Sequence, residues 1–243
     1  MDRAAAALAD RVFLETTRRF AAPRLAGEDV RAALELSQVE PGKPVADLGC
    51  GYGRHLKVLH QQGYERALGI DRSALLLAEA QAEAPHALLV EADLTALPLH
   101  GRSLAAAFCF YSSMFLGSHA DALQALREAA RVLREGGTLV LTTDNPVRLA
   151  ANPSSHFEED VPGLGRVIET SRYDPRENVD QVTKTICRRG GEELSATFRI
   201  RYYLPAQLAE LAAAAGLGRM RLYPDAELTE ATPQLVARLE KTA

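Results

Sequence analysis

The chain has 243 residues, enough to bury one substantial hydrophobic core, so we expect one domain with additions. Its net charge of −4 argues against nucleic acid as the main partner, because binding to phosphates needs a basic surface. No apolar run is long enough to cross a membrane, and the first residues lack the layout of a signal peptide. We therefore expect a cytoplasmic protein with no membrane partner.

The cysteines and histidines indicate no metal centre. Cys50, Cys109 and Cys187 lie far apart and have neither the spacing of metal ligands nor that of a disulfide framework. No other cluster of side chains in the sequence resembles a metal site.

The N-terminal part is predicted to be helical. Residues 3–20 and 27–37 carry apolar side chains at helical spacing, and a turn at residues 41–42 follows them. We interpret Phe13 and Phe20 as core-packing residues of the first helix.

Residues 45–55, Val-Ala-Asp-Leu-Gly-Cys-Gly-Tyr-Gly-Arg-His, predict a short buried strand, a glycine turn and the first turn of a helix. Gly49, Gly51 and Gly53 permit positive φ angles and let a ligand lie against the backbone. The N–H groups at the start of the helix favour an anionic group of that ligand. Asp47 would repel a pyrophosphate, but it can accept hydrogen bonds from an ammonium group.

The glycine spacing disfavours a nicotinamide dinucleotide. The pattern is G-x-G-x-G, and the next position holds Arg54 where the dinucleotide fingerprint has its third glycine. Asp71 ends the next predicted strand, 71 − 51 = 20 residues beyond Gly51, which is the spacing at which an acid reaches the hydroxyls of a ribose. An amino acid joined to a nucleoside, as in S-adenosylmethionine, fits these features better than NAD.

Strands and helices alternate along the middle of the chain. We expect strands at 44–49, 66–70, 87–90, 104–110 and 137–143, with helices at 53–62, 73–83 and 119–134. Such an alternation predicts a parallel sheet covered on both faces, with ligands at the carboxyl ends of its strands. Asp47, Asp71, Asp93 and Tyr111 all fall at such ends.

These motifs, in this order and at this spacing, resemble the class I S-adenosylmethionine-dependent methyltransferases, in the branch that acts on small molecules. The matching blocks are residues 45–53, 69–71, 91–94, 97–99 and 131–139. The resemblance implies an α/β fold with a doubly wound, Rossmann-like seven-stranded sheet in the order 3-2-1-4-5-7-6. It also implies that the N-terminal helices form a lid.

The resemblance further implies that S-adenosylmethionine is the cofactor. The residues expected to bind it are Asp47, Gly49, Cys50, Gly51, Gly53, Asp71, Arg72, Asp93, Leu94 and Phe110. Asp93 and Leu94 would hold the adenine, although a turn cap is the structural alternative for Asp93.

The second half of the chain departs from the bare fold. Residues 146–164 are expected to be a loop, and strands are expected at 166–173, 179–188 and 194–204. The last of these alternates strictly, with Leu194, Ala196, Phe198, Ile200 and Tyr202 on one face. We expect an antiparallel add-on sheet whose apolar face covers either the substrate pocket or a second subunit, which would give a homodimer.

The C-terminal residues are expected to complete the core sheet, with a helix at 205–215 and strands at 218–223 and 234–240. The single domain then has four parts. These are a helical lid (1–40), a cofactor-binding core (41–145), an antiparallel insertion (146–204) and a C-terminal completion of the sheet (205–243).

The predicted function is methyl transfer to an N or O atom of a small-molecule acceptor by in-line displacement. Such a reaction needs alignment and exclusion of water, and it needs a base only where the acceptor atom carries a proton that must leave. The chain lacks the Asn/Asp-Pro-Pro-aromatic motif and the Pro-Cys pair of enzymes that methylate nucleic-acid bases.

The catalytic candidates are Tyr111, at the exit of the fourth strand, and two histidines, His119 and His156, which are preferred over His55. Two alternatives stay open. One is a non-catalytic cofactor-binding protein that acts through an interface on the add-on sheet, and the other is an NAD(P)-dependent oxidoreductase.

Overall fold

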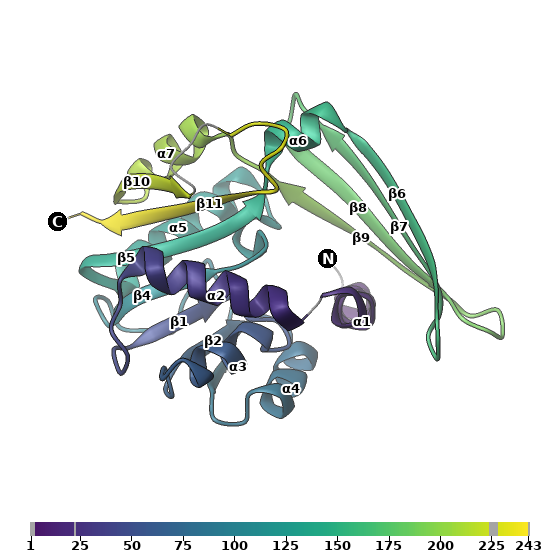
Figure 1. The fold of residues 1–243 in the computed structure, drawn as a ribbon, viewed down its shortest axis with the longest axis horizontal. Coiled ribbons are helices and arrows are strands. Elements are labelled where there is room, and N and C mark those ends of the chain that lie inside the picture. Colours follow the sequence, from purple (N-terminus) through teal and green to yellow (C-terminus); the bar gives the residue numbers. More distant parts are fainter. Residues whose placement is uncertain (1–2, 22, 224–227, 243) are drawn as a thin grey trace.

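A computed structural model describes residues 3–21, 23–223 and 228–242 of the chain (Figure 1). Its core sheet has seven strands in the order β10-β11-β5-β4-β1-β2-β3, and only the pairs that involve β11 are antiparallel. The strands are β1 (Val45–Leu48), β2 (Leu68–Asp71), β3 (Leu88–Glu91), β4 (Leu104–Cys109), β5 (Leu133–Asp144), β10 (Leu217–Tyr223) and β11 (Gln234–Lys241). Numbered within this sheet alone, the order is 3-2-1-4-5-7-6, so the predicted fold class is confirmed.

Helices cover both faces of the core sheet. On one face pack α2 (Pro23–Ser37), α3 (Arg54–Gln61) and α4 (Ala74–Glu83), and on the other pack α5 (His119–Val132) and α7 (Pro205–Ala214). Every residue of β1 and β4 is buried, as expected for central strands of a sheet that is covered twice.

The segment after β3 has no helix or strand, and α5 fixes its position. Glu128 accepts a hydrogen bond from the Leu97 N–H at 2.7 Å, and Arg131 donates to the carbonyl oxygens of Leu97 and Leu99 at 2.8 and 2.7 Å. Glu128 and Arg131 also bond to each other at 2.7 Å. These hydrogen bonds orient the loop that carries Asp93.

The add-on sheet is a separate antiparallel sheet in the order β6-β7-β8-β9. Its strands are β6 (Ser154–Val161), β7 (Gly165–Asp174), β8 (Val179–Cys187) and β9 (Glu193–Arg201). The expectation of a loop over 146–164 was wrong, because α6 (Pro146–Ala151) and β6 lie there. Asn145 caps α6 by accepting from the Val147 N–H at 2.9 Å. The strand β6 was missed because it is an edge strand whose residues are exposed on both faces up to Asp160, so it lacks the alternation that marks a half-buried strand.

The first helix, α1 (Arg3–Phe20), lies between the core and the add-on sheet (Figure 1). Ion pairs tie it to both sides: Glu15 contacts Arg188 of the sheet hairpin at 2.7 Å, and Arg18 contacts Glu79 of α4 at 2.6 Å. The ring of Phe13 packs against that of Phe198, with their centroids 6.3 Å apart. The helix therefore closes the space between the two sheets.

Candidate functional site

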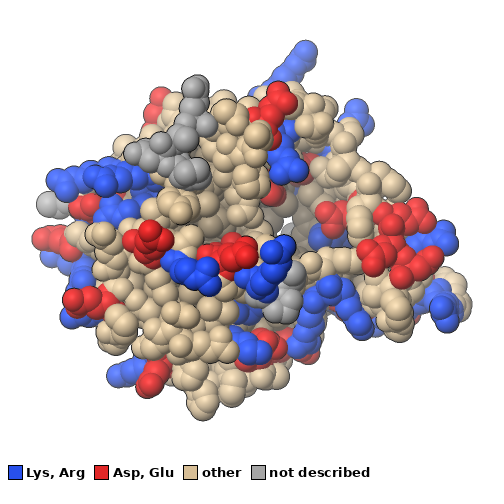
Figure 2. Space-filling model, viewed as in Figure 1, with Lys and Arg blue, Asp and Glu red and all other residues tan. Residues whose placement is uncertain are grey.

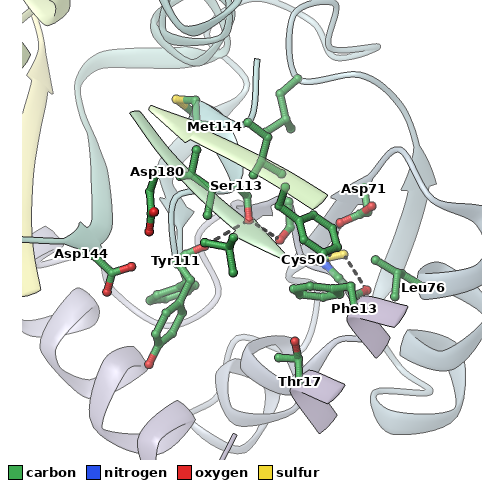
Figure 3. Close-up of a pocket in the computed structure, with 18 of the residues that line it drawn as sticks. Phe13, Thr17, Cys50, Asp71, Leu76, Tyr111, Ser113, Met114, Asp144 and Asp180 are labelled. Atoms are coloured by element: carbon green, nitrogen blue, oxygen red, sulfur yellow. Dashed lines mark hydrogen bonds between the residues drawn. The ribbon is translucent and has the colours of Figure 1, made fainter. Parts of the chain in front are cut away.

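A cavity of about 880 Å³ lies at the carboxyl ends of the core strands, beneath α1 and the inner face of the add-on sheet. The surface is visibly hollowed between the core and that sheet (Figure 2). The glycine-turn end of the cavity is lined by Gly49, Gly51, Asp71, Asp93 and Leu94. The opposite end, here called the sheet end, is lined by Asp144, Glu169, Ser171, Asp180 and Tyr202. Figure 3 shows Asp71 and Asp144 on opposite sides, with Tyr111 and Ser113 between them.

The glycines of the turn serve two purposes: two of them avoid steric clashes with the chain, and one leaves the backbone open to the cavity. Gly49 and Gly53 have φ angles of +80° and +84°, and a Cβ on either would lie within 3.0 Å of the chain, at Ser113 and Ala80. Gly51 also has a positive φ, but a Cβ there would meet only the Phe13 ring, at 3.9 Å. Its open side therefore faces the cavity, as a ligand lying against the backbone requires.

Replacing Gly49 with alanine is expected to destabilise the protein by about 2–4 kcal/mol, because the new Cβ would lie 2.3 Å from Ser113 Cβ. The control is Gly136→Ala, which has a φ of +71° and no atom within 4 Å of its Cβ. That variant should lose only about 1 kcal/mol from backbone strain. Urea denaturation measures both, and equal losses would contradict the proposed steric role of Gly49.

Asp71 is held in place by the glycine turn and by the start of α4. One carboxylate oxygen accepts from the Gly51 N–H and the other from the Ser73 N–H, both at 2.9 Å. Burial raises the pKa of Asp71, although these two N–H groups lower it. Arg72, the next residue, lines the same end of the cavity.

Asp93 and Leu94, which were predicted to hold the adenine, both line the cavity. The turn cap that was the alternative for Asp93 is also formed, since its Oδ1 accepts from the Thr95 N–H at 2.8 Å and from the Thr95 hydroxyl at 2.7 Å. Cys50 and Phe110 line the cavity as well, whereas Gly53 lies outside it and shapes the turn.

Asp47 lies beneath the turn, fully buried and outside the cavity lining. Neither carboxylate oxygen has a hydrogen-bond partner among the described residues. Burial, with a smaller contribution from Asp71 and an opposing one from Arg54, raises the pKa of Asp47 to about 8. Burying an acid without a hydrogen-bond partner costs free energy.

Tyr111 is the only one of the three catalytic candidates that lines the cavity. Its hydroxyl donates to Asp29 of α2 at 2.9 Å, and the guanidinium carbon of Arg54 lies 4.5 Å from the centre of its ring. His55 bonds to the same Asp29 oxygen at 3.2 Å and stacks on Phe110 at 4.0 Å. Burial lowers the pKa of His55 to about 4, against the raising effect of its bond to Asp29.

The other two candidates lie elsewhere. His119 is exposed at the start of α5 and contacts the Tyr203 hydroxyl at 3.2 Å. His156 is exposed on β6 and lies 3.5 Å from Glu158. Neither side chain lines the cavity, so the structure does not bring the three candidates together.

Several cavity residues were not predicted. Phe13 lines the cavity, and Phe20 is 39% exposed, so the expectation that both pack in the core was wrong for Phe20 and incomplete for Phe13. The other missed residues include Asp10 of α1, Asp144, and Glu169, Asp180 and Lys184 of the add-on sheet. The predicted face of the last sheet strand gave one usable signal, because Phe198 and Ile200 do face the cavity.

Comparison with known proteins identifies the core. The family model described as a methyltransferase domain matches residues 46–141, from the first strand to the fifth. Over these residues the chain is similar to methyltransferase domains. The match agrees with the resemblance to methyltransferases that the sequence motifs indicated for this part of the chain.

The relatives of the methyltransferase domain are similar over short stretches. Trans-aconitate 2-methyltransferase from Escherichia coli O1:K1 / APEC is 42% identical over 73 residues, which cover 28% of this chain and 29% of that protein. The chain spans between 29% and 39% of the length of the first curated relatives that it matches.

Solved structures resemble the fold of the whole chain, beyond the methyltransferase domain. The CcbJ methyltransferase from Streptomyces caelestis superposes with a TM-score of 0.74 at 22% identity, covering 89% of this chain and 90% of that one. CalS10 from Micromonospora echinaspora, an amino pentose methyltransferase solved with S-adenosylmethionine bound, gives a TM-score of 0.67 at 18% identity, covering 90% and 91%. None of the described helices combines the length and the apolar character needed to cross a membrane.

Proposed function

We propose that the protein transfers a methyl group from S-adenosylmethionine to an N or O atom of a small-molecule acceptor. The observation that carries this proposal is one continuous cavity that joins the glycine turn to the inner face of the add-on sheet. When bound, S-adenosylmethionine supplies a methyl group on a positively charged sulfur. The volume of about 880 Å³ lies within the range of small-molecule sites.

The residues at the glycine-turn end fit this cofactor. Gly51 leaves the backbone open, Asp71 presents a carboxylate fixed by two N–H groups for the ribose hydroxyls, and Asp93 and Leu94 line the place proposed for the adenine. The unpartnered carboxylate of Asp47 suits an ammonium group.

The lid and the add-on sheet supply what the reaction needs from the rest of the chain. Phe13 of α1 and Phe198 and Ile200 of β9 place apolar side chains over the cavity, which excludes water from the reacting groups. Tyr111 holds a defined position because its hydroxyl donates a hydrogen bond to Asp29 of α2. We therefore propose Tyr111 as the residue that orients the acceptor.

Calorimetric titration with S-adenosylmethionine, its demethylated product and NADH tests the proposal. Asp71→Asn should weaken binding of the first two about tenfold or more, because one charge-assisted acceptor is lost. Glu91→Gln is the matched control, since it removes an exposed carboxylate at the end of the neighbouring strand. Binding of NADH alone would favour an oxidoreductase, and cofactor binding without methyl transfer to any acceptor would favour a non-catalytic protein.

A homodimer through the add-on sheet also stays a proposal. The face of this sheet that points away from the cavity carries hydroxyl pairs, with Thr183 2.9 Å from Thr197 and Thr185 2.9 Å from Ser195. A dimer formed through this face would therefore be polar. Sedimentation velocity over a range of concentrations tests it, and a monomer throughout would refute it.

A further inference from the structure

Three carboxylates from separate elements meet at the sheet end of the cavity. Asp144 ends the core strand β5, Glu169 lies on β7, and Asp180 lies on β8. Figure 3 shows Asp144 and Asp180 on the same side of the cavity, beyond Tyr111 as seen from Asp71. Docking of the add-on sheet onto the core is what brings the three together.

Cations balance these charges only in part. Lys184 forms an ion pair with Glu169 at 2.8 Å. Asp144 accepts from the Tyr202 hydroxyl at 3.0 Å, and Asp180 accepts from the Ser171 hydroxyl at 2.9 and 2.8 Å. Within the described part of the chain, neither of these two aspartates has a Lys, Arg or His nitrogen within 4.0 Å.

The two aspartates also repel each other at this end of the cavity, where Asp180 is buried and Asp144 is exposed. Burial is the largest cause of the raised pKa of Asp180, and the charge of Asp144 adds to it. Burial likewise raises the pKa of Asp144, with Glu169 adding to the rise and the nearby Arg148 opposing it. Only 3% of the Asp180 surface is exposed, so water solvates this carboxylate poorly.

We propose that the acceptor carries an amino group, and that Asp144 and Asp180 recognise it as an ammonium or amine. An ammonium group offers three N–H donors and a positive charge to the two carboxylates, whereas a hydroxyl group offers one donor and no charge. A carboxylate on the acceptor would add to the repulsion. Val182 and Ile200 line the same part of the cavity, so the rest of the acceptor has apolar surface. This inference rests on the proposed function and names its substrate class.

The test uses protein saturated with S-adenosylhomocysteine and a panel of cyclic monoamines that includes amino sugars. Each amine is paired with the alcohol and the carboxylic acid that carry the other group at the same position. Calorimetry should show that at least one amine binds tenfold or more tightly than its paired alcohol and acid. Methyl incorporation from labelled S-adenosylmethionine should show the same preference.

Variants assign the preference to the two aspartates. Asp144→Asn and Asp180→Asn should each lower the affinity for the amine at least tenfold, with little change for the alcohol and an unchanged affinity for S-adenosylhomocysteine. The control is Glu193→Gln, which removes an exposed carboxylate at the start of β9, outside the cavity, and should change nothing.

The outcomes separate this inference from the proposed function. If S-adenosylhomocysteine binds but no amine in the panel binds better than its paired alcohol, the amine assignment is wrong and methyl transfer still stands. An amine preference that survives in both aspartate variants also overturns it. If S-adenosylhomocysteine itself does not bind, the proposed function fails first.

Discussion

Replacing Asp47 with asparagine is expected to stabilise the ligand-free protein at alkaline pH and to weaken the binding of S-adenosylmethionine. Asp47 is fully buried, and neither of its oxygens has a hydrogen-bond partner among the described residues. Burial raises its pKa to about 8, so the carboxyl group is mostly protonated at neutral pH when no ligand is present. Asparagine matches its shape and carries no charge.

The pH dependence follows from the direction of this shift. In the unfolded chain an aspartate has a pKa of about 3.9, so between that value and about 8 the folded state holds a proton that the unfolded state has lost. The free energy of unfolding therefore falls as the pH rises through this window, by about 1.4 kcal/mol for each pH unit. Above pH 8 the ionised Asp47 costs the ligand-free protein several kcal/mol.

Denaturation curves of wild type and Asp47→Asn from pH 5 to pH 9 measure this effect. The variant should gain stability relative to wild type as the pH rises, and its advantage should level off above pH 8. Glu91→Gln, an exposed carboxylate at the same edge of the sheet, should run parallel to wild type. Parallel curves for Asp47→Asn and wild type would show that Asp47 does not titrate in this window.

Cofactor binding should lower the pKa of Asp47, so that the carboxyl group loses its proton in the complex. A bound ammonium group favours the ionised carboxylate, so we expect close to one proton to be released on binding at pH 7 and none in Asp47→Asn. Calorimetry in two buffers with different ionisation enthalpies counts the protons. The affinity of Asp47→Asn for S-adenosylmethionine should fall at least tenfold. Asp47 would then destabilise the ligand-free protein at alkaline pH and stabilise the complex.

The glycine-turn end of the site could be predicted because its residues lie close together in the sequence. The turn at Gly49 and Gly51 needs positive φ angles that leave a visible mark in the sequence, and Asp71 follows at a spacing set by one strand–helix–strand unit. Burial of the central strands produces apolar runs that are equally easy to recognise. The seven-stranded order then follows from the family pattern.

The sheet end could not be predicted in the same way. Asp144 and Asp180 lie 36 positions apart in the sequence (180 − 144), and their meeting depends on how the add-on sheet docks onto the core. The choice among the histidines could not be made from the sequence for a related reason, because the sequence does not show which residues surround a titratable side chain. His119 and His156 are exposed, whereas His55, in the helix after the glycine turn, is the one that lines the cavity.

Replacing His55 with glutamine is expected to make the protein more resistant to acid. His55 is 4% exposed, stacks on Phe110 and bonds to Asp29 at 3.2 Å. Burial lowers its pKa to about 4, and Arg54 adds to the lowering, so the folded state keeps the ring neutral at physiological pH. Glutamine retains a donor for Asp29 and removes the titration.

The expected pH window lies below that of Asp47. An unfolded histidine has a pKa of about 6.5, so the unfolded state takes up a proton that the folded state refuses between that value and about 4. The contribution of His55 is complete above pH 6.5 and is lost as the pH falls, by about 3 kcal/mol at pH 4.

Urea denaturation at pH 7, 5.5 and 4.5 tests this, with His119→Gln as the control because His119 is exposed and lies outside the cavity. His55→Gln should lose about 1 kcal/mol at pH 7 through poorer packing and should then lose less than wild type on acidification. The His119 variant should follow wild type throughout.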